Sequence, residues 1–247
     1  MISIIALKEF RSFFAAPATW FTVAALQFIF AWFFLARLDA FLQVQVQLAQ
    51  LANAPGATLA VATPLFGTIA LIMMMLVPIF TMRLLAEERR NQTLTLLMTA
   101  PVSARDIVLG KFFGLMLFLL LIIATCTLMV LTLMLGTRLD LGLLFSNACG
   151  LFLLTACYVA LGLYISSLTA QPLVAAISSL AALFGLWLME VSAVDNDHIW
   201  HAFSPTTHFQ NFNVGLLNSG DLVFLLLFCM TFLLLAMRRL RNNSIYG

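Results

Sequence analysis

The sequence contains very few charged residues. Only 9% of its 247 residues are Asp, Glu, Lys or Arg, whereas 63% are hydrophobic and the mean hydropathy is +1.08. A soluble domain of this size normally carries about 25% charged residues. The chain therefore lacks the polar surface that a water-soluble fold requires, and the composition predicts an integral membrane protein.

Motifs of enzymes, metal sites and nucleotide-binding loops are also absent from the sequence. Neither H-E-x-x-H nor G-x-S-x-G occurs, and Gly110-Lys111-Phe112 lacks the upstream glycine and the Ser/Thr of a P-loop. The four cysteines, which show no C-x-x-C spacing, are Cys126, Cys149, Cys157 and Cys229. Cysteines in such apolar surroundings are typical small buried residues. We expect no catalytic residue, no metal, no cofactor bound by this chain and no nucleic-acid partner.

Six apolar stretches are long enough to cross a bilayer whose hydrocarbon core is about 30 Å thick. They cover about residues 20–36, 64–85, 112–135, 143–168, 173–189 and 222–237. The last stretch is short for a span, and Ser219 or Asp221 is a plausible N-cap for it. The fold class that we predict is an all-α integral membrane domain covering the whole chain, 1–247, with six transmembrane helices.

The positions of Lys and Arg predict the orientation of these helices. With the N-terminus inside the cell, ten of the twelve basic residues fall in cytoplasmic segments, and only Arg37 and Arg138 fall outside. We therefore expect a multi-pass protein of the inner (cytoplasmic) membrane with both termini in the cytoplasm. Lys8, Glu9 and Arg11 interrupt the first apolar run, so we expect no cleavable signal peptide.

The N-terminal segment is amphipathic. At the helical spacing of about 100° per residue, one side carries Ala6, Leu7, Phe10, Phe13 and Phe14. The other side carries Lys8, Glu9, Arg11 and Ser12. This pattern predicts an interfacial helix that binds membrane lipid, with the phenylalanines among acyl chains and Lys8 and Arg11 near the phosphates. The alternative is a simple extension of the first span.

Residues 83–111 join the second and third stretches on the cytoplasmic side. The second helix can extend as far as Arg90, and Asn91-Gln92 is a plausible break. Thr93 and Pro101 would then begin and end a short helix. One face of this helix carries Leu94, Leu97 and Met98. These side chains must be buried against the protein's own helix ends, the lipid interface or a groove on a partner protein.

This segment resembles the signature of ABC-2 type permeases. The signature runs roughly Glu-Glu-(Arg/Lys)-x-x-Gly-Thr-x-Glu-x-Leu-Leu-x-x-Pro-(Val/Leu)-Ser, and a Gly-Lys pair opens the next helix. The matching residues are Glu87, Glu88, Thr93, Leu96, Leu97, Pro101, Val102, Ser103, Gly110 and Lys111. Gln92 stands where glycine is usual, and Thr95 stands where glutamate is usual.

Two further stretches match this family, and the first of them resembles its gliding-motility branch. The first is Lys8–Pro17, which is similar to the opening Glu-(Leu/Phe)-x-x-(Tyr/Phe)-Phe-x-(Ser/Ala)-Pro of that branch. The second is Ser204–Gly215, which is followed by Asp221 just before the last span.

The resemblance implies the permease subunit of an ABC transporter. Two permeases, as a homodimer or a heterodimer, would pair in the membrane and associate with ABC ATP-binding subunits that hold ATP and Mg²⁺. The implied ATPase-coupling interface comprises Glu87, Glu88, Arg90, Thr93, Leu94, Leu97, Met98 and Pro101. Hydrolysis on the separate subunit would drive substrate movement, with export as the expected direction.

The segment after the fifth stretch is expected to form short external or re-entrant helices. By resemblance, Phe203, Phe209 and Phe212 would close an external gate. The same segment holds possible metal ligands at Asp195, Asp197, His198, His201 and His208. Their spacing matches no established ligand pattern, so we interpret them as solvated.

A different function is a non-transporting membrane anchor in a motility or assembly complex, since the branch that the chain resembles is associated with motility. A secondary carrier is less favoured, because the predicted spans contain no mid-bilayer charge of the kind that ion-coupled carriers use.

Overall fold

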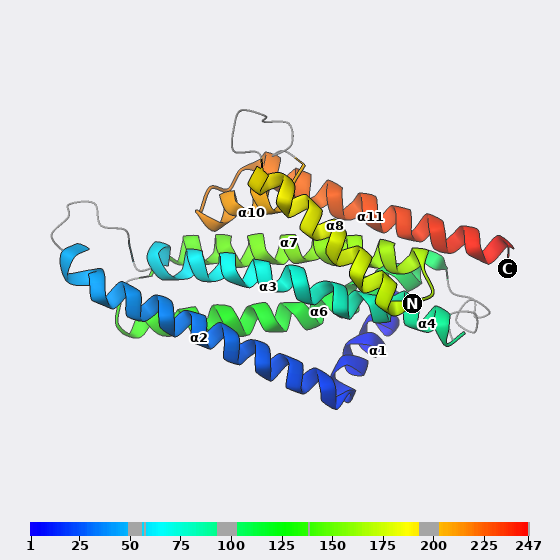
Figure 1. Ribbon diagram of the computed structural model, residues 1–247, viewed down its shortest axis with the longest axis horizontal. Coiled ribbons are helices and arrows are strands. Elements are labelled where there is room, and N and C mark those ends of the chain that lie inside the picture. The colour runs from blue at the N-terminus through cyan, green and yellow to red at the C-terminus, as the bar shows by residue number, and fades with distance from the viewer. Residues whose placement is uncertain (49–55, 57, 93–102, 138, 193–202, 247) are drawn as a thin grey trace.

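The computed structural model describes residues 1–48, 56, 58–92, 103–137, 139–192 and 203–246. Every regular element in this part of the chain is a helix (Figure 1). The long helices are α2 (Pro17–Leu48), α3 (Thr63–Met82), α6 (Ala104–Leu131), α7 (Leu141–Leu168), α8 (Pro172–Ser192) and α11 (Ser219–Tyr246). The shorter α-helices are α1 (Ile2–Ala15), α4 (Glu88–Arg90) and α10 (Pro205–Asn213).

Short π and 3₁₀ segments lengthen two of the helices. The π-helix η1 (Thr58–Ala62) leads into α3, and the π-helix η2 (Arg83–Glu87) continues α3 into α4. The 3₁₀ helix η3 (Thr132–Leu135) extends α6. The second spanning element is therefore one continuous helical rod from Thr58 to Arg90.

Six helices are long and apolar enough to cross a membrane. They cover Pro17–Val44, Thr58–Arg90, Ala104–Leu135, Leu141–Leu168, Pro172–Val191 and Ser219–Asn242. The predicted fold class, an all-α membrane protein with six spans, is thus confirmed. The helices extend beyond the stretches expected from hydropathy, because helical hydrogen bonding continues into residues too polar for the bilayer core.

The central helix of the bundle is α7. It packs against α3, α6, α8, α10 and α11, and small residues let these neighbours approach. A Cβ atom on Gly162 would overlap the Thr81 side chain of α3, and one on Gly150 would lie 2.5 Å from Cβ of Phe212 on α10. Both positions therefore require glycine for the observed packing.

The start of α11 differs from the expectation for its N-cap. The Asn218 Oδ1 atom accepts the backbone N–H of Gly220, at 3.2 Å. Neither Ser219 nor Asp221 is the cap, because both lie inside the helix. The Asp221 carboxylate instead binds His208 and Asn211 of α10.

The two ends of the bundle carry different short elements. α1, α4 and both chain ends lie at one end, and α10 lies toward the other (Figure 1). Buried polar side chains lie at both ends, among them Glu9 and Lys111 at the first and Asn213 and Asp221 at the second, and each end provides a candidate site.

Candidate functional site

The first site begins with the close packing of α1 along α6. A Cβ atom on Gly110 would lie 2.6 Å from side-chain atoms of Ile5. One on Gly114 would lie 2.7 Å from Cβ of Glu9 and 2.9 Å from the carbonyl oxygen of Ala6. The two glycines are four residues apart and share one face of α6. Without side chains on that face, the backbone of α1 can rest directly on α6.

An aromatic cluster joins α1 to α3 and α6. The Phe13 ring stacks on Phe118 with centroids 5.1 Å apart and meets Phe80 edge-on at 5.8 Å. Phe13 is buried, whereas Phe10 and Phe14 are half-buried. The expectation that Phe13 lies among acyl chains is therefore wrong, because the ring gains more contact between two helices than in lipid.

A buried ion cluster lies beside this aromatic contact. The ammonium of Lys111 on α6 is 3.1 Å from Oε1 of Glu9 on α1 and 2.6 Å from Oε1 of Glu88 on α4. Lys111 is only 1% exposed. We call Glu9, Lys111 and Glu88 the charged triad. One cation thus binds two carboxylates that come from two other elements.

The Glu9 side chain lies on a different side of α1 from the one predicted. The amphipathic pattern placed it on the outward, polar side of the N-terminal helix, but it is 8% exposed and faces α6. Leu7, predicted on the apolar side, is half-exposed instead. The helix is rotated because pairing with Lys111 in a low-dielectric environment outweighs the burial of one leucine.

The segment before Glu88 is fixed to α7. The π-helix η2 shifts the backbone hydrogen-bond register, and the N–H of Ala86 donates to the Ser166 hydroxyl at 3.0 Å. Next to it, a cavity of about 290 Å³ lies between α1 and η2. Its polar lining includes Lys8, Glu9, Ser12, Arg83, Glu87 and Glu88.

The helical rod ends where the sequence predicted a break. α4 ends at Arg90, and Asn91 and Gln92 form a turn in which Gln92 has φ +58°. This left-handed conformation favours glycine. Gln92 occupies the position at which glycine is usual in the permease signature, so the turn is retained here with a side chain that fits it less well.

Gln92→Gly is therefore expected to stabilise the fold by about 0.5–1 kcal/mol, because a side chain in the left-handed region costs about 1–2 kcal/mol and glycine loses part of this gain in chain entropy. The thermal unfolding midpoint of the purified protein measures the effect. Asn91→Gly is the matched control, since Asn91 has φ −84° and gains nothing. Equal midpoints for the two variants would contradict the strain.

The second site lies around α10. Asn213 donates from Nδ2 to the carbonyl of Thr63 at 2.9 Å, and the Thr63 hydroxyl donates to the carbonyl of Asn213 at 3.1 Å. On the other side, Asp221 of α11 binds His208 at 2.5 Å and Asn211 at 2.9 Å. The helix is thus held between α3 and α11 by polar contacts.

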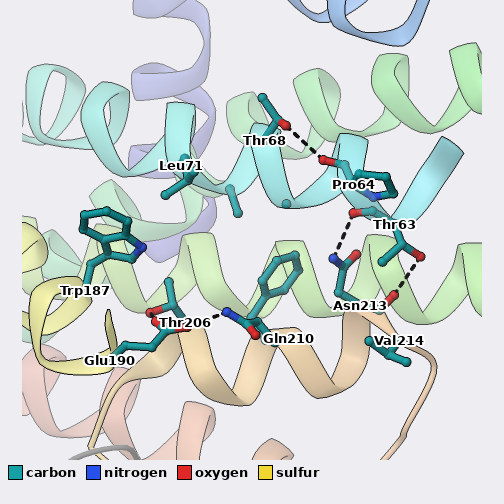
Figure 2. A pocket seen from close by; sticks show the side chains of 13 residues that line it. Thr63, Pro64, Thr68, Leu71, Trp187, Glu190, Thr206, Gln210, Asn213 and Val214 are labelled. Carbon is teal, nitrogen blue, oxygen red and sulfur yellow. Dashed lines mark hydrogen bonds between the residues drawn. The ribbon is translucent and has the colours of Figure 1, made fainter. Parts of the chain in front are cut away.

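A cavity of about 550 Å³ lies between α3, α8 and α10. Figure 2 shows Glu190 of α8 facing Thr206 and Gln210 of α10. The Glu190 carboxylate accepts hydrogen bonds from the Ser204 hydroxyl at 3.3 Å, from the Gln210 amide at 2.5 Å and from the Thr206 hydroxyl. We call this space the α10 cavity.

The comparison with known families decides the identity. The sequence profile of the ABC-2 family transporter proteins matches residues 3–244, a range that contains both sites and all six spans. The chain belongs to the ABC-2 transporter family. No curated protein shows a significant match to it. An ABC-2 permease is a transmembrane subunit of an ABC transporter, is not itself the catalytic subunit, and implies an ATP-binding partner subunit.

Only part of the predicted coupling interface of this ABC-2 permease lies in the described structure. Glu88 belongs to the charged triad, while Glu87 and Arg90 are exposed at the end of the rod. The other predicted members are outside the described residues: Thr93, Leu94, Leu97, Met98 and Pro101. The short helix expected there stays a prediction.

The three phenylalanines of the predicted external gate have different surroundings. Phe209 and Phe212 are each 2% exposed and pack in the core of the ABC-2 domain, whereas Phe203 is 60% exposed. Of the possible metal ligands, His208 pairs with Asp221 and stacks on Phe224 at 4.1 Å. Asp195, Asp197, His198 and His201 lie outside the described residues.

Sequence reasoning missed the partners of Glu9, Lys111 and Glu190. One signal for the first pair was available: Gly110 and Gly114 flank Lys111 on α6, and small residues often mark a face where a second helix packs closely. The hydrogen bonds of Glu190 had no such signal, because its partners lie 14 to 20 residues further along the chain.

Proposed function

We propose that this ABC-2 permease couples ATP hydrolysis on a separate ABC subunit to the export of a substrate across the inner membrane. The charged triad is the observation that supports this most strongly. Glu88 belongs to the predicted coupling interface, and its carboxylate is bonded to a lysine that also holds α1. A displacement of residues 88–92 by the ATPase would therefore act on α1 and α6 together.

The basic residues at the triad end support the proposed orientation, with this end in the cytoplasm. α1, α4 and both chain ends lie there (Figure 1). The basic side chains of those elements are Lys8, Arg11, Arg89, Arg90, Arg238, Arg239 and Arg241. The positive-inside rule favours the cytoplasm for this end, which puts the α10 cavity on the external side.

A second permease copy is supported by the uneven burial of the helices. Only 17% of the α2 and α8 spanning windows is buried, compared with 61% for the rod that contains α3 and for α7. α3 nevertheless exposes a stripe of Leu71, Met75 and Ile79 at intervals of four residues. A partner permease, as a homodimer or heterodimer, would lie opposite this stripe.

The coupling proposal is tested by the double variant Leu94→Asp/Leu97→Asp. We expect it to lose the co-purifying ATPase in a mild-detergent pulldown followed by mass spectrometry and an ATPase assay, because aspartate cannot be buried in an apolar groove. The matched control is Leu216→Asp/Leu217→Asp. Both of these leucines are exposed just after α10, at the far end of the bundle.

Each outcome of the pulldown decides between functions. An ATPase retained by the control and lost by the Leu94/Leu97 variant supports coupling through this segment. An ATPase retained equally by both variants contradicts it. A wild-type chain that purifies with other subunits but without ATPase favours the membrane anchor suggested by the likeness of Lys8–Pro17 to the motility branch.

A further inference from the structure

The α10 cavity has one charged group in its described lining. That group is Glu190, whose oxygens accept hydrogen bonds from neutral hydroxyl and amide groups among the described residues. The ion pairs formed by the described residues do not include Glu190. Neutral donors orient a carboxylate but leave its charge uncompensated. A carboxylate held this way favours a bound cation.

A second acceptor lines the same cavity. Asn213 is buried, and its Nδ2 group donates a hydrogen bond to the carbonyl of Thr63. Its Oδ1 atom is buried without a hydrogen-bond partner among the described residues. Buried acceptors of this kind are normally satisfied. The cavity thus presents one charged acceptor, Glu190, and a neutral acceptor without a described partner, Asn213 Oδ1, lies enclosed in its wall.

Trp187 adds an aromatic surface beside the carboxylate. It lies three residues before Glu190, so the two side chains share one face of α8, and both line the cavity (Figure 2). The face of an indole attracts ammonium groups. A metal ion would instead need several charged or imidazole ligands, and the described residues contain no cluster of three such groups.

The wall that α3 contributes to the cavity includes Pro64, Ala70 and Leu71 beside Thr63 and Thr68. Leu71 lines the cavity and is also the first residue of the exposed Leu71, Met75 and Ile79 stripe. Successive members of this stripe are about 6 Å apart along the helix axis. An alkyl chain attached to a group in the cavity could therefore lie along the stripe within the membrane.

We propose that the α10 cavity binds the ammonium group of an amphiphilic amine, with its hydrocarbon chain along α3. Glu190 accepts the ammonium protons, and Trp187 covers the cation. An amphiphilic amine would then be the substrate class of the proposed exporter. Only the role of the amine as a transported substrate rests on that proposed function. Binding itself requires no ATPase, so it can be tested independently of coupling.

The test is equilibrium binding of radiolabelled octylammonium to the full chain in phosphatidylcholine nanodiscs, with empty discs subtracted. We expect saturable binding that is displaced by unlabelled octylammonium but not by octanol or octyl sulfate. Butylammonium should compete at least about tenfold more weakly, since it lacks about four methylene groups of buried chain. Equal competition by octanol, or by butylammonium, would overturn the proposal.

Glu190→Gln is the decisive variant, because it keeps the shape of the side chain and removes its charge. We expect octylammonium affinity to fall about tenfold or more. Asp39→Asn is the matched control: Asp39 is exposed on α2 and contacts only the Gln43 amide in the described structure. Equal affinities of Glu190→Gln and wild type would disprove the role of Glu190. The wild-type competition series remains decisive if the variant does not fold.

The amine can belong to a lipid headgroup or to a single-chain compound. Nanodiscs containing phosphatidylethanolamine distinguish these sources. A weaker apparent octylammonium affinity in such discs identifies the lipid headgroup, and an unchanged affinity identifies the single-chain amine. Failure of the pulldown experiment together with intact octylammonium binding would remove the coupling proposal and leave this binding site in place.

Discussion

Lys111→Met is expected to destabilise the folded protein by about 3–5 kcal/mol. The ammonium of Lys111 is 1% exposed and binds both Glu9 and Glu88. Methionine fills a similar volume, but it leaves two carboxylates facing each other in a buried space with no lysine between them. The thermal unfolding midpoint in a fixed detergent measures the loss.

Two further variants isolate the electrostatic cause. Lys8→Met makes the same substitution beside the same carboxylate, but the Lys8 side chain is 64% exposed and 3.8 Å from Glu9, so it should cost less than about 1 kcal/mol. The triple variant Glu9→Gln/Glu88→Gln/Lys111→Met should regain most of the stability lost in Lys111→Met. A triple variant as unstable as the single one would show that the lysine acts through packing alone.

Gly114→Leu is expected to detach α1 from α6. Even a Cβ atom at this position would lie 2.9 Å from the carbonyl oxygen of Ala6. This oxygen belongs to the backbone of α1, so it can move away only if the whole of α1 moves. Overpacking of this kind costs about 1–3 kcal/mol, to which the loss of the Glu9–Lys111 contact adds. Labelling of an introduced Phe13→Cys with a maleimide should become rapid, because position 13 is buried only while α1 is docked.

Gly185→Leu provides the matched control for this variant. Gly185 lies inside α8, and among the described residues no atom beyond its chain neighbours and the nearby α8 backbone is within 4 Å of a Cβ placed there. Leucine at this position should leave the labelling rate unchanged and improve helix propensity by about 0.5–1 kcal/mol. If the Gly114 and Gly185 variants give the same labelling rate, α1 does not depend on a bare glycine face.

The sequence predicted the architecture well because hydropathy reports directly on the bilayer. Each apolar stretch corresponds to one long helix, and the break at Asn91-Gln92 follows α4 as expected. The orientation of the helices around their own axes was harder to predict. In a membrane the lipid-facing and protein-facing sides are both apolar, so Phe13 could not be distinguished from Phe10 before the packing was known.

Contacts between distant segments were beyond the reach of pattern analysis. Glu9 and Lys111 are 102 residues apart, and no periodicity relates them. Glu190 was located correctly near the end of a predicted span, but its environment depends on how α10 folds back against α8. Sequence reasoning identified Glu88 because it belongs to a continuous signature, and not from its place in the charged triad.

The sharing of one ammonium by two carboxylates has a mechanical consequence. α1 and α4 cannot move independently, because displacing either helix strains its ion pair with the Nζ atom of Lys111. Intermediate positions would expose a charge to a low-dielectric interior and are therefore costly. The triad end of the protein should behave as a two-position switch, either fully engaged or fully released, and not as a spring that yields gradually.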